Sequence, residues 1–227
     1  MTPDDILANA ERLIADARHL HDVGRSRSAA TLVVVALEQF GSFVEEITKE
    51  KFPHAVVHMG IFGDKANAHA KRQDALAGHL YNFVMGELST QFMFEIFYHK
   101  TRCGDPEKLL QWLVNAAAPL AFSDEQKERM KSSKEMQSAS LLMNFVREGR
   151  LRHLREFGLY ENSELRFSPA SIQQVIELAE LVREILVRSR NVLVPEPMSL
   201  AGVNMPAGII MDDEGEWLLQ LNHRHQG

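Results

Sequence analysis

The feature that most constrains the fold is a long apolar segment that carries one carboxylate. Residues 24–42 read GRSRSAATLVVVALEQFGS, and residues 29–39 are apolar except for Thr31 and the pair Glu38-Gln39. No turn signal interrupts the chain for about two dozen residues, a length that predicts a helix rather than a strand. A helix that is apolar on nearly every side is buried at the centre of a domain. A carboxylate such as Glu38 must then be paired or hydrogen-bonded there.

Helix signals continue along most of the chain. Thr2-Pro3-Asp4-Asp5 combines a capping hydroxyl, a proline for the first turn and two acids, and Gly24 is a plausible stop. The spacing of apolar residues predicts further helices. The predicted helices cover residues 2–24, 26–51, 66–100, 106–116, 123–156 with a bend at Gly149, and 168–188.

These elements predict an all-α fold, an antiparallel bundle of four to five long helices over residues 1–190. The tail, residues 191–227, is rich in Pro, Gly and Met, and Trp217-Leu218-Leu219 suggests a strand. We therefore expect a short non-helical appendage at the C-terminus, either a small hairpin or a docking segment.

Composition narrows the classes of protein. The 227 residues are 45% hydrophobic and carry a net charge of −6, so no global basic field favours nucleic acid. Cys103 is the only cysteine, which excludes an intramolecular disulfide and a cysteine-rich zinc site. There is no run of 18 apolar residues and no secretory signal pattern, so we expect a cytoplasmic protein without a membrane span.

Four pieces of the chain, taken in order, resemble one family. They are ANAERLIADARHLHDVGRSRSAATLVVVALEQFG, AHAKRQ at 68–73, LREFGLYEN at 154–162, and the Ser168-Pro169 start of the last helix. Together they resemble the abortive-infection protein V (AbiV) family, which belongs to the HEPN superfamily of helical-bundle proteins. The resemblance extends over about residues 6–188.

This resemblance implies a bacterial anti-phage protein. Superfamily members are often dimers, many are metal-independent ribonucleases that use an Arg-x(4–6)-His motif, and others are non-catalytic. The AbiV branch is linked to shutting down translation in infected cells. At the end of the second helix's apolar run the family usually has Glu-Glu followed by Gly-Lys, whereas this chain has Glu38, Gln39, Gly41 and Ser42.

Three stretches fit the Arg-x(4–6)-His spacing, about as many as such a loose motif produces by chance. Seven residues nearly restore the same face of a helix, so Arg72 shares a face with His79, as Arg12 does with His19. Arg147 and His153 are six apart and converge only if the helix bends or a second protomer supplies one partner. We read Arg12 and His19 as surface residues.

The first candidate site is the block around Arg72 and His79. RNA cleavage by its own 2′-OH needs a base and an acid, for which histidine is suited near neutral pH, and an arginine can hold the phosphate. His79 is assigned as acid/base and Arg72 as the phosphate ligand. His69, a further catalytic candidate, helps to orient the site with Lys71 and Glu38. The alternative for His79 is a satisfied, partly buried histidine.

The second candidate is REGRLRHLRE at 147–156, the strongest local positive patch. Its residues Arg147, Arg150, Arg152 and His153 are assigned to RNA binding or catalysis, and the alternative is a solvated helix face. No Glu-x-x-His pair or phosphate-binding glycine loop is present, so no metal and no cofactor are expected.

Two functions stay open at this stage. One is an anti-phage effector, a homodimer that acts on RNA or otherwise blocks translation. The other is a non-catalytic helical bundle that binds a protein partner or a nucleotide. For Glu38 the sequence favours the His69-Lys71-Arg72 block as its partner, either as a structural polar contact or as part of a site.

Overall fold

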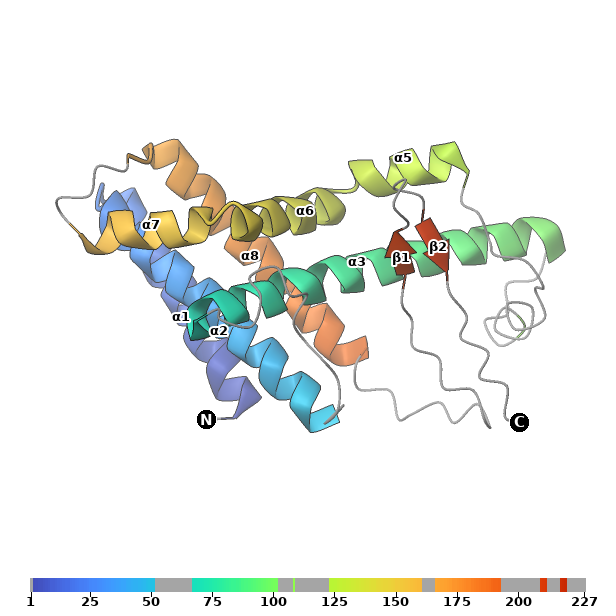
Figure 1. Ribbon diagram of the computed structural model, residues 1–227, viewed down its shortest axis with the longest axis horizontal. Coiled ribbons are helices and arrows are strands. Elements are labelled where there is room, and N and C mark those ends of the chain that lie inside the picture. The colour runs from blue at the N-terminus through green and yellow to red at the C-terminus, as the bar shows by residue number, and fades with distance from the viewer. Residues whose placement is uncertain are drawn as a thin grey trace. The chain divides into compact units, whose positions relative to one another are not determined.

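The computed structural model describes residues 2–51, 67–101, 108, 123–160, 166–192, 209–211 and 217–219. Its described helices and strands are shown in Figure 1. They are α1 (Pro3–Asp22), α2 (Ser26–Lys51), α3 (Ala68–Thr101), α5 (Asp124–Ser132), α6 (Lys134–Arg147), α7 (Arg150–Leu159), α8 (Pro169–Val192), β1 (Ile209–Met211) and β2 (Trp217–Leu219). The predicted all-α helical bundle is confirmed.

The first helix begins and ends where local signals predict. The Thr2 hydroxyl accepts a hydrogen bond from the Asp5 backbone N–H at 3.2 Å, and the Asp5 carboxylate accepts one from the Thr2 N–H at 2.9 Å. This reciprocal capping box, with Pro3 in the first turn, starts α1. The chain leaves α1 through Gly24, whose φ of 78° lies in the left-handed region that glycine tolerates.

The central helix of the bundle is α2, as its composition predicts. α1 packs along α2, and α7 packs on α2. Ser26–Glu50 is the one described helix long and apolar enough to cross a membrane, and 61% of its most apolar window is buried within the protein. That burial fits a core helix. The buried apolar side chains of α2 include Val33, Val34, Leu37, Phe40 and Phe43.

Ion pairs tie the last long helix to the first. Arg18 Nε lies 2.6 Å from Glu180 Oε1, and Arg183 Nε lies 2.7 Å from Glu11 Oε1. A third pair joins Arg190 to Asp4. Residues with higher numbers in α8 pair with residues with lower numbers in α1, so the two helices run antiparallel.

The prediction of one continuous helix over 123–156 is wrong at Ser133, and the predicted bend at Gly149 is a second break. The helix is interrupted at Ser133, whose backbone is extended (φ −64°, ψ 140°). The Ser133 hydroxyl caps the next helix by accepting a hydrogen bond from the Met136 N–H at 3.1 Å. A second break falls at Gly149, with φ 68°, where a bend was expected. Three helices therefore replace one.

The described contacts divide the chain into two compact units. One comprises residues 1–81 and 137–190, and the other comprises residues 82–136 and 191–227. In the second unit, β1 pairs antiparallel with β2, with Ile210 opposite Leu218. The domain boundary at residue 190 stays a prediction. Cys103 and all of the predicted helix 106–116 except residue 108 lie outside the described residues.

Candidate functional site

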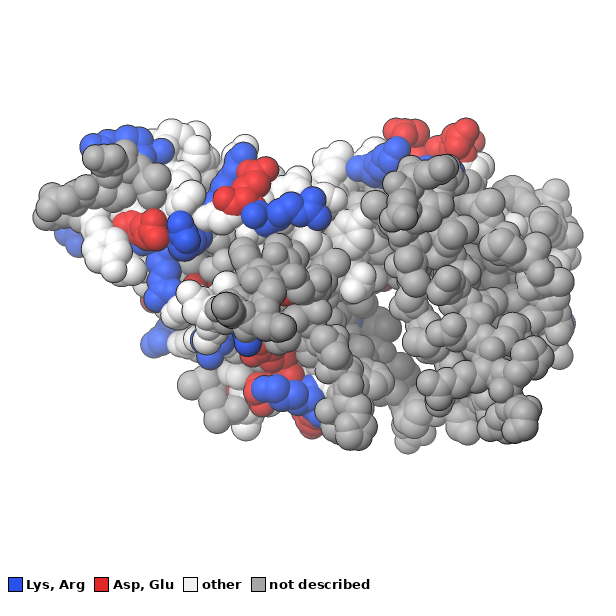
Figure 2. All heavy atoms as spheres, viewed as in Figure 1, with Lys and Arg blue, Asp and Glu red and all other residues white. Residues whose placement is uncertain are grey.

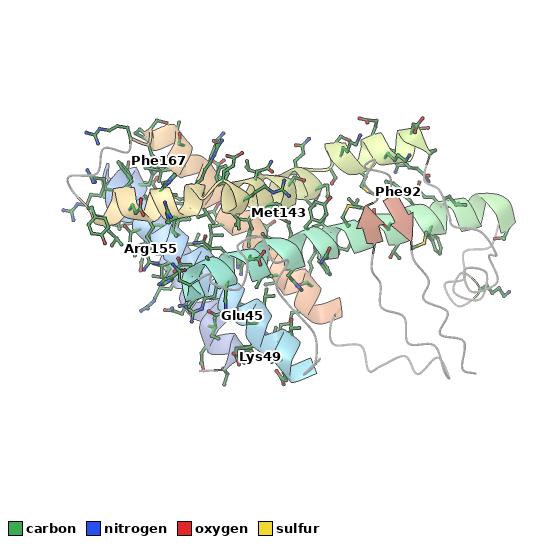
Figure 3. The ribbon with its side chains drawn as sticks, viewed as in Figure 1. Glu45, Lys49, Phe92, Met143, Arg155 and Phe167 are labelled. Atoms are coloured by element: carbon green, nitrogen blue, oxygen red, sulfur yellow. The ribbon has the colours of Figure 1, made fainter. Side chains whose placement is uncertain are left out.

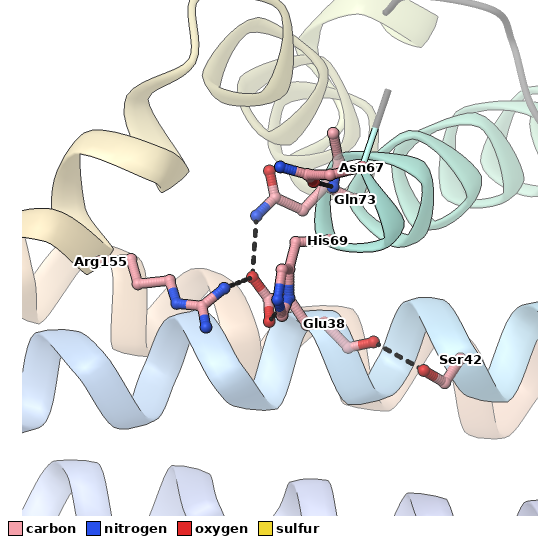
Figure 4. Close-up of polar contacts among 7 residues, drawn as sticks. Glu38, Ser42, Asn67, His69, Gln73 and Arg155 are labelled. Carbon is pink, nitrogen blue, oxygen red and sulfur yellow. Dashed lines mark hydrogen bonds and ion pairs between the residues drawn. The ribbon is translucent and has the colours of Figure 1, made fainter. Parts of the chain in front are cut away.

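The carboxylate of Glu38 lies at the centre of a polar cluster in the first unit. Glu38 is 3% exposed. Its Oε2 lies 2.8 Å from Nδ1 of His69, while its Oε1 accepts from Gln73 Nε2 at 3.3 Å and from Arg155 Nη1 at 3.2 Å (Figure 4). We call these four residues the Glu38 cluster. Its hydrogen bonds explain how α2 tolerates a buried carboxylate, and the expected pairing with His69 is confirmed.

His69 stands at the first turn of α3. Asn67 caps this helix, because its Oδ1 accepts from the Ala70 N–H at 2.9 Å. The His69 side chain is 44% exposed, against 4% for Glu38. A carboxylate partner at Nδ1 favours the tautomer with the proton on Nδ1, so that Nε2 carries the lone pair. Within the described part of the chain, Nε2 of His69 has no hydrogen-bond partner, which is the arrangement that a proton acceptor needs.

The two remaining members of the cluster, Gln73 and Arg155, were not among the predicted site residues. Arg155 belongs to α7 and is labelled in Figure 3. Gln73 lies in AHAKRQ and Arg155 in LREFGLYEN, two of the pieces that carry the family resemblance. The cluster therefore joins one piece from α2, one from α3 and one from α7. The presence of Gln73 and Arg155 in pieces that carry the family resemblance was the one indication in the sequence that they belong to the site.

Two glycines let the three helices approach closely enough to form the cluster. A Cβ on Gly41 of α2 would lie 2.1 Å from the Arg72 carbonyl oxygen of α3. A Cβ on Gly158 of α7 would lie 2.1 Å from Thr31 Oγ1 of α2. No real side chain fits at such distances, so these positions hold α3 and α7 against α2.

Arg27 fastens the C-terminal end of α7 to α2. Its Nη2 donates to the Phe157 carbonyl oxygen at 2.8 Å and also to the Tyr160 carbonyl oxygen. Its guanidinium lies 4.8 Å from the centroid of the Phe157 ring. The helix that presents Arg155 is thus held at its end by hydrogen bonds and a cation–π contact.

The departure from the family pattern at Ser42 has a simple local outcome. The Ser42 hydroxyl donates to the Glu38 carbonyl oxygen, one turn earlier in α2, at 3.2 Å (Figure 4). This bond satisfies the hydroxyl within its own helix and adds no charge. The positive charge beside Glu38 comes instead from Arg155.

His79 lies in a different environment from His69. Its Nε2 is 3.1 Å from the Ser189 hydroxyl of α8, and that hydroxyl donates to the Leu186 carbonyl oxygen at 2.9 Å. Burial lowers the pKa of His79 from 6.5 to about 4. A histidine with this pKa is neutral at pH 7 and a poor match to acid–base chemistry there.

Arg72 and His79 do lie on the same helix, as expected, but about 10 Å apart along its axis by the rise of an α-helix. Arg72 is partly exposed and Lys71 is exposed. Burial favours the structural alternative for His79. The catalytic pairing of Arg72 with His79, like the roles of Lys71 and Glu38, stays a prediction.

The arginine-rich stretch is largely paired with its own acids. Arg150 Nε lies 2.5 Å from Glu148, and Arg152 Nε lies 3.4 Å from Glu156. Arg147 is exposed at the end of α6, while His153 is partly buried in α7. Figure 2 shows basic and acidic side chains side by side on the face in view. The RNA-binding role of Arg147, Arg150, Arg152 and His153 stays a prediction.

The other sequence observations concern single residues. Arg12 donates to Asn9 Oδ1 at 2.8 Å, and both Arg12 and His19 are exposed, as expected for surface residues. Among the described residues, no group of three or more His, Cys, Asp or Glu side chains is arranged to hold a metal ion.

Comparison with known proteins identifies the first two helices. Residues 2–55 match the sequence model of the HEPN_AbiV family, described as AbiV. The match spans α1 and α2 and includes Glu38, and it confirms the resemblance to an AbiV-like HEPN family. No curated protein and no solved structure matches the chain.

Proposed function

We propose that this protein is an abortive-infection protein that cleaves RNA at the Glu38 cluster. The AbiV match over residues 2–55 supports the anti-phage role. The observation that supports cleavage is the 2.8 Å bond between the buried Glu38 carboxylate and Nδ1 of a half-exposed histidine, His69. A carboxylate that orients an imidazole is a recurring element of acid–base sites.

The chemistry uses the second ring nitrogen of His69, which does not contact Glu38. Nε2 takes the proton from a ribose 2′-OH, and the 2′-oxygen attacks the adjacent phosphorus. The bond to the 5′-oxygen breaks, this oxygen takes a proton from solvent, and a 2′,3′-cyclic phosphate remains. Glu38 stabilises the imidazolium that forms, and the neighbouring Lys71 and Arg72 provide positive charge for the phosphate.

Cleavage of RNA by the purified protein tests this proposal. The wild type should give products with 2′,3′-cyclic phosphate ends in the presence of EDTA. His69→Ala should lower the rate by at least about 100-fold, the contribution typical of a general base. His79→Gln serves as the matched control on the same helix and should retain cleavage. Equal rates for wild type and His69→Ala would remove the cluster from the mechanism.

The same variants tested in a phage-infected host connect chemistry to protection. Expression of the wild type should reduce plaque formation, and His69→Ala should abolish that protection. Chromatography with light scattering would test the proposed homodimer.

A non-catalytic binding protein is the second candidate, and one observation favours it. The Glu38 carboxylate is bonded to side chains of both α3 and α7, so the cluster also serves as a polar contact that joins these helices to α2. This function predicts protection against phage that survives His69→Ala, with no RNA cleavage by the wild type.

A further inference from the structure

Glu38 is shared between a permanent cation and a side chain that can be neutral. We propose that Arg155 is a positioning residue that neutralises Glu38 and thereby leaves His69 uncharged and able to accept a proton. The inference rests on the proposed function for its consequence in catalysis. Its electrostatic part concerns the four residues of the Glu38 cluster alone.

The two basic side chains occupy different oxygens of the carboxylate. His69 lies on Oε2 at 2.8 Å, whereas Arg155 lies on Oε1 at 3.2 Å. Gln73 shares Oε1 with Arg155 at 3.3 Å and carries no charge. Arg155 therefore compensates the carboxylate without displacing the histidine, and both can be bound at once.

Burial makes this compensation necessary. The Glu38 side chain is 4% exposed, while those of Arg155 and His69 are 29% and 44% exposed. Water reaches the two bases much more than the carboxylate, so the negative charge depends on protein partners. With Arg155 in place, the pair formed by Glu38 and Arg155 has no net charge. Without it, the cation available to Glu38 within hydrogen-bond reach is the imidazolium of His69, and a protonated imidazole is not a base.

Charged side chains outside the Glu38 cluster also lie on α2, α3 and α7. Lys49 of α2 lies 2.9 Å from Glu46, and Arg152 of α7 is paired with Glu156. Glu45 of α2 and three residues of α3, namely Lys71, Arg72 and the buried Asp74, are also charged groups. Among the hydrogen bonds and ion pairs of the described residues, none of these groups contacts the Glu38 carboxylate.

NMR of protein labelled with ¹⁵N in its histidine rings tests the proposal directly. We expect Arg155→Met to keep both ring nitrogens of His69 protonated up to a pH about one unit higher than in the wild type, because an opposite charge left alone favours the charged imidazole. Arg155→Lys should restore the wild-type titration. An unchanged titration in Arg155→Met would overturn the proposal.

The matched control is Arg18→Met. Arg18 is a similarly exposed arginine (34%) of the same unit that is bonded to the carboxylate of Glu180. Its loss should leave the His69 titration unchanged, and a shift equal to that of Arg155→Met would show a general effect of lost positive charge. If Arg155→Met does not fold, Arg155→Gln removes the charge but keeps a hydrogen-bond donor for Oε1.

A double variant and the pH–rate profile complete the test. Glu38→Gln with Arg155→Met removes both charges and should abolish the upward shift, and a shift that persists would contradict the proposal. In active protein, the acidic limb of RNA cleavage should move upward with the His69 titration in Arg155→Met. If the wild type cleaves no RNA, the proposed function fails, while the ring titration still decides the role of Arg155.

Discussion

His69 and His79 stand on the same helix and in the same unit, yet their surroundings differ in kind. His69 lies at the exposed first turn of α3 and faces a carboxylate, while His79 lies further along, partly buried, and faces the hydroxyl of Ser189. Burial lowers the pKa of His79 to about 4. The surroundings of each histidine, and not its spacing from an arginine, therefore make His69 a candidate base and His79 a structural residue.

The largest expected effect comes from disrupting the close contact between α2 and α3 that brings His69 to Glu38. Gly41→Ala places a Cβ 2.1 Å from the Arg72 carbonyl oxygen, so α3 must move away from α2. We expect a loss of about 3 kcal/mol in the free energy of unfolding, at the upper end for overpacking. Urea denaturation measures it.

The control for this substitution is Gly86→Ala, also within a helix. A Cβ on Gly86 has nothing within 4 Å. Alanine is the better helix former there, so stability should rise by up to about 1 kcal/mol. Equal losses at both positions would show that Gly41 is not a close-approach site.

The His79 side of the comparison responds to pH. Because the folded-state pKa is about 4 and the ordinary value is 6.5, the unfolded chain binds this proton more readily between these values. Stability contributed by neutral His79 is present above pH 6.5 and is lost as the pH falls towards 4. The free energy of unfolding should fall by about 2 kcal/mol from pH 7 to pH 5 through this group.

Denaturation curves of His79→Gln at both pH values isolate that contribution. Glutamine can donate to Ser189 but does not titrate. The variant should therefore lose about 2 kcal/mol less than the wild type over this interval. The same pH dependence in both proteins would assign the effect to other groups.

A smaller loss is expected when the charge of Glu38 is removed with its shape preserved. Glu38→Gln leaves His69 and Arg155 with a weaker acceptor, and we expect a destabilisation of about 1.5 kcal/mol, the lower value for hydrogen bonds to charged groups. Chemical denaturation at pH 7 measures it. Unchanged or increased stability would mean that desolvation of the carboxylate cancels its bonds.

The smallest effect should follow from a change in the arginine-rich stretch. Arg152 is 70% exposed and pairs with Glu156 one turn away. Arg152→Ala should change stability by less than about 0.5 kcal/mol, as for other exposed pairs. Thermal unfolding provides the measurement. A loss of stability comparable to that of Glu38→Gln would show that the Arg152–Glu156 pair stabilises the fold.

Much of the fold could be predicted because its signals are local. The start of α1 depends on Thr2 and Asp5, three residues apart, and the bend at Gly149 depends on that residue's own backbone. The break at Ser133 was missed because serine is common inside charged helices as well as at caps. In the structure Ser133 is extended and its hydroxyl caps α6.

The candidate site was only partly predictable. The burial of Glu38 followed from the apolar segment around it, and pairing with His69 followed from the need to compensate that burial. Arg155 was passed over, although its stretch was singled out, because the four arginines there have similar sequence neighbours and differ only in the direction in which α6 and α7 point them. Three others point to local acids or solvent, and Arg155 points to Glu38.

The sequence by itself determined the helices, their caps and the presence of a buried carboxylate in the central one, because these depend on residues within a few turns of one another. Only the tertiary structure decided which base meets that carboxylate. His69, Gln73 and Arg155 lie 31, 35 and 117 residues from Glu38. Their meeting depends on how closely α2, α3 and α7 approach one another, which Gly41 and Gly158 set through the space they leave empty.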